Sequence, residues 1–166
     1  MKIAVLGYSG AGKSALAREL GKRCGCPVLH LDQVQFEAGW RERDRGEALA
    51  LVERFMSQES WVIDGNYAAF LQGRRLEEAD RIILLCLNRF SCLVRAVKRY
   101  LIYRGRTRED MAEDCPEKLD PEFLVWLLWK GRDKAFYSAV ASRYPHKTVV
   151  LNDQRAINRF LEGLSC

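Results

Sequence analysis

A glycine-rich run near the start of the chain carries the clearest chemistry in the sequence. Residues 7–14 read Gly-Tyr-Ser-Gly-Ala-Gly-Lys-Ser and match the Walker A pattern GxxxxGK[ST], directly after the apolar stretch Ile3–Leu6. In such a loop the backbone N–H groups surround phosphate oxygens, Lys13 reaches the β and γ phosphates, and the Ser14 hydroxyl ligates Mg²⁺. We therefore expect a site for ATP with Mg²⁺. Its nucleotide contacts would be Gly7, Ser9, Gly10, Ala11, Gly12, Lys13, Ser14 and Ala15.

The same run also fits a looser pattern, that of a dinucleotide-binding loop. Residues 10–15 satisfy GxGxx[GA], and Asp32 lies roughly 20 residues further on, where that fold has an acid for a ribose. A dinucleotide loop needs no metal-ligating hydroxyl beside a lysine, so the Lys13-Ser14 pair and Gly7 favour a triphosphate. The helix that follows would also direct its positive end at the phosphates.

The basic residues are concentrated in one segment of the chain. The 166 residues have a formal net charge of +5, yet the segment from Arg81 to Arg108 has eight basic residues and no acidic one, which leaves the remainder net negative. One concentrated basic segment suits a compact polyanion such as the phosphates of a nucleotide better than it suits duplex DNA. An ordinary solvated helix face is the alternative interpretation.

Expected strands and helices alternate along the chain, which predicts a three-layer α/β fold. A parallel sheet of five strands would have helices on both faces and its ligand site at the carboxyl ends of the strands, within a single domain of residues 1–166. Residues 107–119 mix charge with Pro116 and show no apolar period, so they predict a loop that closes over a site, part of a lid at about 104–120. The expected strands are 2–6, 28–31, 61–63, 81–87 and 148–151, and the expected helices are 14–24, 42–57, 90–103, 120–143 and 153–164.

Two acids follow expected strands directly, Asp32 after residues 28–31 and Asp64 after residues 61–63. Either could serve at the ligand site, or could simply form a turn or cap a helix. Within the long expected helix of residues 120–143, the helical spacing of Trp126 and Trp129 predicts that both lie in the core, with a place at a cofactor site as the alternative.

Other classes of protein are disfavoured by composition. Six cysteines show no CxxC spacing and the chain has only two histidines, so we expect no structural zinc. No apolar run approaches the roughly 18 residues of a membrane span, and Met1 leads directly into the first expected strand. We expect a cytoplasmic protein without a membrane partner.

The chain resembles the P-loop kinases of the adenylate kinase type, and within them the DNA topology modulation proteins (FlaR-related). The resemblance implies a strand order of 2-3-1-4-5 and an ATP- and Mg²⁺-dependent phosphotransferase that acts on a small-molecule acceptor. The segments that carry it are residues 2–13, 29–32, 61–67, 74–80 and, most specifically, 103–119, which read Tyr-Arg-Gly-Arg-Thr-Arg-Glu-Asp-Met-Ala-Glu-Asp-Cys-Pro-Glu-Lys-Leu.

The resemblance also implies roles for particular residues. Asp64 would hold Mg²⁺ through water together with Ser14, and Asp32 would orient the acceptor hydroxyl or a metal-bound water. Lid arginines would join Lys13 in stabilising the transferring phosphoryl group, with Arg95 or Arg99 near the adenine or the α phosphate. The candidate lid arginines are Arg99, Arg104, Arg106 and Arg108.

One departure from the adenylate kinase pattern concerns the acceptor. The arginine expected shortly after Asp64-Gly65 is replaced by Asn66, Tyr67 and apolar residues up to Leu71, which argues against a nucleoside monophosphate. Arg74 and Arg75 could substitute, although their spacing differs. The acceptor loops, 33–40 and 66–73, combine the polar Gln33, Gln35, Asn66 and Tyr67 with the aromatic Phe36, Trp40 and Phe70, which suits a planar ring or simple loop packing.

Two other functions remain open on the sequence alone. An ATP-dependent modulator of DNA topology would use the segment from Arg81 to Arg108 on DNA phosphates, although the sequence has no recognised nucleic-acid-binding motif. A nucleotide-binding regulator would bind Mg·ATP with little turnover.

Overall fold

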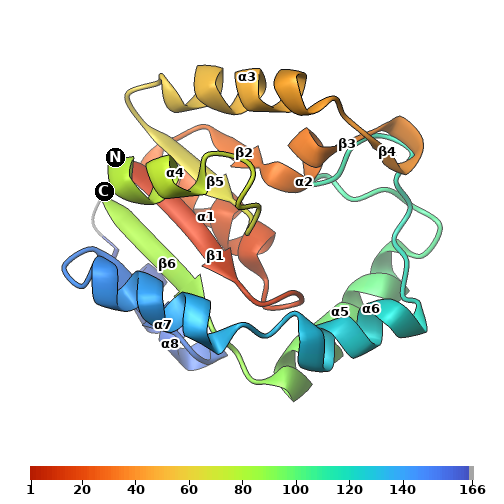
Figure 1. Ribbon diagram of the computed structural model, residues 1–166. Helices are drawn as coiled ribbons and strands as arrows, with labels where there is room; N and C mark the ends of the chain where they lie inside the picture. Colours follow the sequence, from red (N-terminus) through yellow and green to blue (C-terminus); the bar gives the residue numbers. More distant parts are fainter. Residues whose placement is uncertain (165–166) are drawn as a thin grey trace.

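The computed structural model describes residues 1–164, and a parallel sheet of five strands lies at its centre (Figure 1). Its strands are β1 (Lys2–Gly7), β2 (Val28–His30), β5 (Trp61–Asp64), β6 (Arg81–Leu85) and β7 (Thr148–Leu151), in the order β2-β5-β1-β6-β7. Every neighbouring pair is parallel. Numbered along the chain, these five strands have the order 2-3-1-4-5, as expected.

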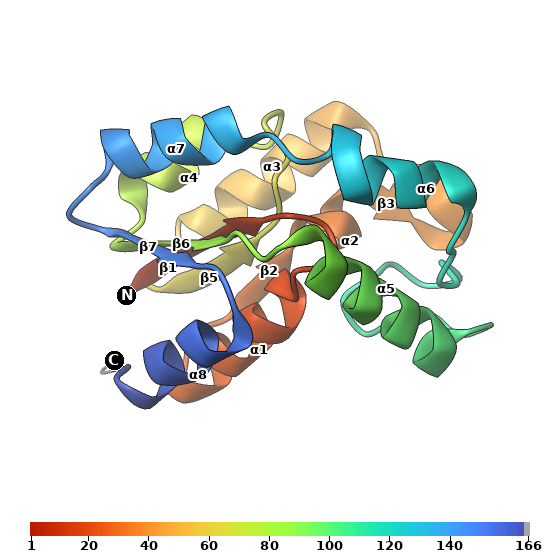
Figure 2. The same cartoon turned by 90° about the horizontal axis from the view of Figure 1, so that it is seen from below.

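Helices cover both faces of the sheet, which confirms the three-layer α/β architecture (Figure 2). One face carries α1 (Lys13–Cys24) and α8 (Gln154–Glu162), and the other carries α3 (Arg45–Met56), α4 (Gln72–Glu78) and α7 (Lys134–Arg143). The remaining long helix, α5 (Arg89–Tyr103), follows β6 and extends past the carboxyl ends of the strands.

The two central strands are apolar along their whole inner length because both of their faces are covered. Residues 3–6 of β1 and residues 82–85 of β6 have no exposed surface. A strand buried on both sides requires a continuous apolar run rather than an alternating one. β6 ends at Leu85, two residues before the predicted end.

Short polar side chains begin most of the helices. The carboxylate of Asp44 accepts hydrogen bonds from the N–H groups of Gly46 and Glu47 at the start of α3, and Asp153 accepts from Ala156 at the start of α8. Gly25 ends α1 in the left-handed conformation, with φ 62°. These caps satisfy backbone groups that a helix end leaves unpaired.

The expectation of one helix over residues 120–143 is wrong. The segment contains α6 (Pro121–Val125), a π-helical turn at Trp126–Lys130, and a break before α7. At the break the N–H of Gly131 donates to the carbonyl of Trp126, and a Cβ on Gly131 would lie 2.6 Å from the Trp126 ring. The close contact therefore needs a glycine, and Asp133 caps the new helix.

The core assignment of the two tryptophans in this segment is also wrong. Trp126 is 42% exposed and Trp129 is 59% exposed. The two tryptophans do lie in a helical segment, but the residue that this segment buries is Leu127. The tryptophan side chains are therefore available at the surface or at a cavity.

A buried arginine fixes the loop that follows β5. The Arg75 side chain has no exposed surface and donates hydrogen bonds to the carbonyls of Phe70 (2.8 Å), Gly65 (3.2 Å) and Tyr67 (2.8 Å). Burial lowers its pKa to about 10, although the Asp64 carboxylate opposes the shift. Arg75 thus pins residues 65–70 against the sheet.

We predict that Arg75→Met lowers the free energy of unfolding by about 3 kcal/mol, at about 1 kcal/mol for each buried carbonyl left without its donor. The matched control is Arg74→Met, which removes an exposed side chain paired with Glu78 and should leave the stability nearly unchanged. Urea unfolding followed by circular dichroism measures both. Equal losses in the two variants would contradict this role of Arg75.

Candidate functional site

The phosphate-binding loop joins β1 to α1 in a conformation that depends on its glycines. Gly7, Gly10 and Gly12 have φ values of 152°, 74° and 94°. A Cβ on Gly7 would lie 2.5 Å from the Leu85 carbonyl oxygen, and one on Gly10 would lie 2.6 Å from that of Cys92. Only glycine combines this backbone conformation with such close approach. The loop therefore lies tightly against β6 and α5.

Side chains from three other segments hold this loop in place. The Asn66 side chain accepts from the Gly7 N–H (3.1 Å) and donates to the Gly7 carbonyl (2.7 Å). Arg95 donates to the carbonyl of Ala11 at 2.8 Å, and the Arg132 guanidinium lies 3.8 Å from the centre of the Tyr8 ring. Asn66 also lines a cavity beside this loop, so its contact with a substrate stays a prediction, as does the approach of Arg95 to the nucleotide. No pattern in the sequence indicated a role for Arg132.

Lys13 is the cation of this loop. Its ammonium donates to the carbonyl of Tyr8 at 3.3 Å. Burial lowers its pKa, while the carboxylates of Asp32 and Asp64 act in the opposite direction. The two strand-end acids are therefore close enough to Lys13 to influence its charge, as the parallel sheet predicts.

Asp64 gathers polar side chains from α1 and β2. Its Oδ2 accepts from the Ser14 hydroxyl at 2.8 Å, and its Oδ1 lies 2.5 Å from Nδ1 of His30. The carboxylate and the imidazole are both buried. A hydroxyl beside a carboxylate oxygen fits Mg²⁺, which takes oxygen ligands and usually keeps several waters and substrate phosphates. His30 orients the carboxylate through the oxygen that Ser14 does not contact.

No group of three or more His, Cys, Asp or Glu side chains within residues 1–164 could hold a metal ion by itself. Mg²⁺ in a phosphate-transferring site does not need such a cage, because one or two protein ligands suffice.

Four of the cysteines, Cys26, Cys86, Cys92 and Cys115, are free, and Cys166 lies outside the described residues.

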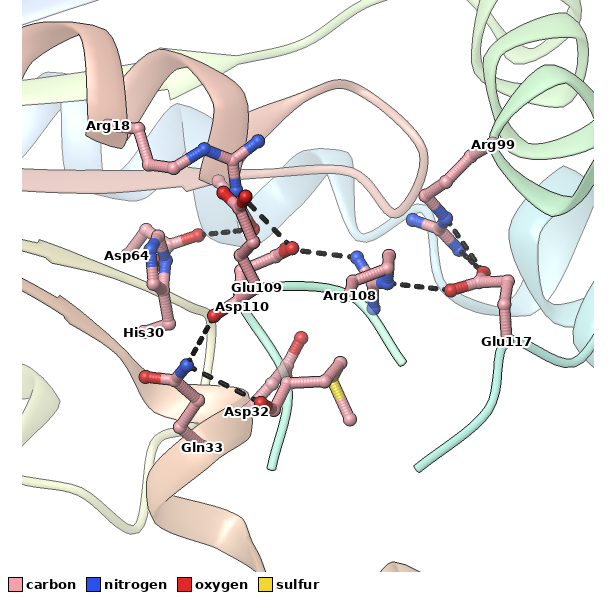
Figure 3. A network of polar contacts seen from close by, with 12 residues as sticks. Arg18, His30, Asp32, Gln33, Asp64, Arg99, Arg108, Glu109, Asp110 and Glu117 are labelled. Atoms are coloured by element: carbon pink, nitrogen blue, oxygen red, sulfur yellow. Dashed lines mark hydrogen bonds and ion pairs between the residues drawn. The ribbon is translucent and has the colours of Figure 1, made fainter. Parts of the chain in front are cut away.

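Residues 104–120, which we call the lid segment, bring acids to the arginines (Figure 3). Glu117 accepts from Arg99 of α5 at 2.7 Å and pairs with Arg108 at 2.6 Å. Arg108 also donates to Asp110 at 2.9 Å, and Asp110 pairs with Arg18 of α1 at 3.3 Å. These ion pairs connect α5, the lid segment and α1 in one network.

Both acids of the network are buried, and no sequence pattern marks either of them as a site residue. Asp110 is 4% exposed and Glu117 is 8% exposed. Burial alone would raise the pKa of Asp110, but the charges of Arg108 and Arg18 and the hydroxyl of Ser14 outweigh it and lower the pKa. Asp110 is therefore ionised beside the phosphate-binding loop.

The predicted lid arginines divide into two groups. Arg99 and Arg108 line a cavity beside the phosphate-binding loop. Arg104 and Arg106 are exposed at the end of α5 and do not line it. Their contact with a phosphate stays a prediction.

A cavity of about 610 Å³ lies between the phosphate-binding loop, the hairpin of β3 (Phe36–Glu37) and β4 (Arg41–Glu42), and α6. At its floor the Tyr67 hydroxyl donates to Asp32 Oδ1 at 2.8 Å. Burial and the nearby Asp32 raise the pKa of Tyr67, so the phenol stays a neutral donor. The lining residues are Ser9, Lys13, Asp32, Phe36, Trp40, Asp64, Gly65, Asn66, Tyr67, Arg99, Arg108, Met111, Glu117, Lys118, Asp120, Phe123 and Trp126.

Several residues expected near the acceptor lie elsewhere. Gln33 donates to the carbonyls of Glu109 and Met111 in the lid segment, and Phe70 is buried against the Tyr67 ring. Arg74 and Arg75 do not line the cavity. Neither arginine replaces the one that is missing after Asp64-Gly65.

Solved structures with a similar fold include two kinases, although neither a family model nor a curated protein matches the sequence. Shikimate kinase from Acinetobacter baumannii, in complex with shikimate, is 20% identical with a TM-score of 0.59, over 97% of this chain and 89% of that one. Deoxyadenosine kinase from M. mycoides is 17% identical with a TM-score of 0.54, over 98% and 97%. The chain has the fold of P-loop kinases.

No helix within residues 1–164 is long and apolar enough to cross a membrane.

We predict that Lys13 titrates below the usual lysine pKa and that Asp32→Asn lowers its pKa further, because the Asp32 carboxylate stabilises the ammonium. The folded protein would then lose this proton at a lower pH than the unfolded chain, so the contribution of Lys13 to stability rises with pH across that interval. NMR titration of the lysine ¹³Cε resonances measures the pKa. Asp44→Asn is the control, and an unchanged Lys13 titration in Asp32→Asn would contradict the prediction.

Proposed function

We propose that this protein transfers the γ-phosphoryl group of Mg·ATP to a hydroxyl group of a small-molecule acceptor. The observation that carries the proposal is a single cavity lined at one end by Lys13, Arg99 and Arg108, and on its floor by Asp32. Cations that stabilise a transferring phosphoryl group thus lie in the same space as a carboxylate suited to receive a hydroxyl proton.

The residues have distinct parts in this reaction. The acceptor oxygen forms a bond to the γ phosphorus while the bond between that phosphorus and the bridging oxygen breaks, and ADP leaves with the electron pair. Asp32 accepts the hydroxyl proton and later releases it to water, with Tyr67 orienting the carboxylate. Lys13 and the backbone N–H groups of residues 7–14 bind the phosphates.

Ser14 and Asp64 would hold Mg²⁺, which neutralises phosphate charge when it is bound. Arg99 and Arg108 are held ready by Glu117, and phosphate oxygens compete with that carboxylate for the two guanidinium groups. The lid segment would thus close on the triphosphate by exchanging partners rather than by recruiting distant arginines. We further propose that residues 1–166 act as one domain in the cytoplasm.

We predict that Lys13→Ala abolishes acceptor-dependent ADP release from Mg·ATP, with a loss of at least about 100-fold, because the main charge on the β and γ phosphates is removed. Lys22→Ala is the matched control, since Lys22 is exposed on the same helix. A coupled assay measures ADP, and thermal unfolding verifies that both variants fold. Unchanged turnover in Lys13→Ala would refute the proposal, and Mg·ATP binding without transfer to any acceptor would favour a regulator.

A DNA partner is the second candidate, in line with the resemblance to DNA topology modulation proteins. The observation that favours it is a group of exposed basic residues on α5 and just after it, namely Arg89, Lys98, Arg104 and Arg106. Arg95, Arg99 and Arg108, by contrast, contact the protein itself. Only part of the basic segment is therefore free to meet a second polyanion.

If this second candidate holds, duplex DNA binds with an affinity that falls steeply with salt, by roughly one power of salt concentration per phosphate contact. Lys98→Glu combined with Arg106→Glu should then abolish binding while Mg·ATP binding persists. Fluorescence anisotropy of a labelled duplex at increasing salt measures this effect. No binding at low salt would remove DNA from consideration.

A further inference from the structure

The far end of the cavity, away from the phosphate-binding loop, is built largely from aromatic rings. Phe36 and Trp40 come from the hairpin side, with ring centroids 5.3 Å apart. Phe123 and Trp126 come from α6 and the π-helical turn, stacked with centroids 6.4 Å apart. All four line the cavity. Aromatic walls with a few placed polar groups are typical of sites for flat organic ligands.

We propose that the acceptor is a phosphate-free planar heterocycle that carries a hydroxyl group, as a nucleoside does, with its ring held between these aromatic walls and its hydroxyl on Asp32. This inference rests on the proposed phosphotransferase function and specifies its substrate class.

Trp40 is held in an unusual way for a loop residue. Its φ is 64°, in the left-handed region that a bulky side chain rarely adopts. Its N–H donates to Cys115 Sγ at 3.2 Å, and the same sulfur donates to the carbonyl of Glu37 at 3.4 Å. Strain maintained by surrounding contacts is characteristic of binding sites. The Trp40 indole N–H is buried and meets no acceptor within residues 1–164, which leaves a donor in the wall.

The charges at this end of the cavity disfavour an acceptor phosphate. Asp32, where the two ends meet, and Asp120, the exposed cap of α6, both line the cavity, and each would repel a phosphate dianion. Arg75 is committed to backbone carbonyls, and Arg43 donates to the Val34 carbonyl and pairs with Glu37. A monophosphate would therefore meet acids where a kinase of monophosphates needs guanidinium groups.

One cation does lie at this end, that of Lys118, whose ammonium is 5.3 Å from the centre of the Trp40 ring. The residue is exposed, and a single flexible ammonium lacks the bidentate geometry with which arginines bind phosphate. Lys118 therefore covers the aromatic wall rather than forming a phosphate site.

Asp32 connects the aromatic end to the phosphate end. It accepts from Tyr67 at 2.8 Å, and its charge acts on Lys13. A hydroxyl bound on Asp32 would thus face the γ phosphate held by Lys13. The reaction is the balanced transfer described above, with ATP as the phosphoryl donor, the phosphate ester and ADP as products, and the hydroxyl proton released through Asp32.

The first test compares acceptors in matched pairs, with ADP release from Mg·ATP and product mass as readouts. The planar acceptors are deoxyadenosine, thymidine, cytidine and pyridoxine. The others are the 5′-monophosphates of the three nucleosides, and shikimate and glucose as hydroxylated compounds without an aromatic ring. We expect a planar, phosphate-free acceptor to raise ADP release at least about tenfold over the rate without acceptor, a difference of about 1.4 kcal/mol in the barrier.

The outcomes separate this inference from the function on which it rests. If a monophosphate, shikimate or glucose is the best acceptor, the inference is overturned and the phosphotransferase proposal stands. If no compound raises ADP release above the Lys13→Ala level, both are overturned.

The second test uses Trp126→Ala with Trp129→Ala as its matched control, because both rings are largely exposed in the same π-helical turn and only Trp126 lines the cavity. We expect Trp126→Ala to raise the KM for the best planar acceptor about tenfold, with the KM for ATP changed less than about twofold. Trp129→Ala should change neither. A rise in the KM for ATP alone would assign the aromatic wall to adenine and overturn the inference.

Discussion

The buried carboxylate of Asp64 is the interaction on which the rest of the site depends. It ends β5, accepts the hydroxyl of Ser14 at the start of α1, and lies against His30 at the end of β2. A buried charge is costly unless it is paired and hydrogen-bonded, so these three elements are constrained to meet at one edge of the sheet. The carboxylates of Asp64 and Asp32 also act on the charge of Lys13, so this end of the sheet influences the electrostatics of the phosphate-binding loop.

Three cations of the cavity interact with carboxylates. Asp32 and Asp64 act on the charge of Lys13, and Glu117 of the lid segment pairs with Arg99 and Arg108. Under the proposed function, these carboxylates would keep the cations near the positions in which they bind the triphosphate. Such preorganisation lowers the cost of arranging charges when a reaction begins, because the dipoles and charges already point the right way.

Much of this architecture follows from the sequence, because the signals are local. The glycine loop, the five strands and the cap at Asp44 all depend on residues close together in the chain. The hairpin of β3 and β4 was missed because strands of two residues show no periodicity, and the break at Gly131 was missed because it depends on contact with Trp126. Asp110 and Glu117 were not singled out, since only the fold brings them to Arg18 and Arg99. The hydrogen bonds between Asn66 and Gly7 depend on the fold in the same way.

The sulfur of Cys115 joins the hairpin to the lid segment through its contacts with Trp40 and Glu37. One wall of the cavity is thus hydrogen-bonded to the segment that carries Arg108 and Glu117. Under the proposed function, a ligand that displaces this wall would also displace the arginines. The two halves of the cavity would then be coupled, and thermodynamic linkage requires the coupling to be equal in both directions.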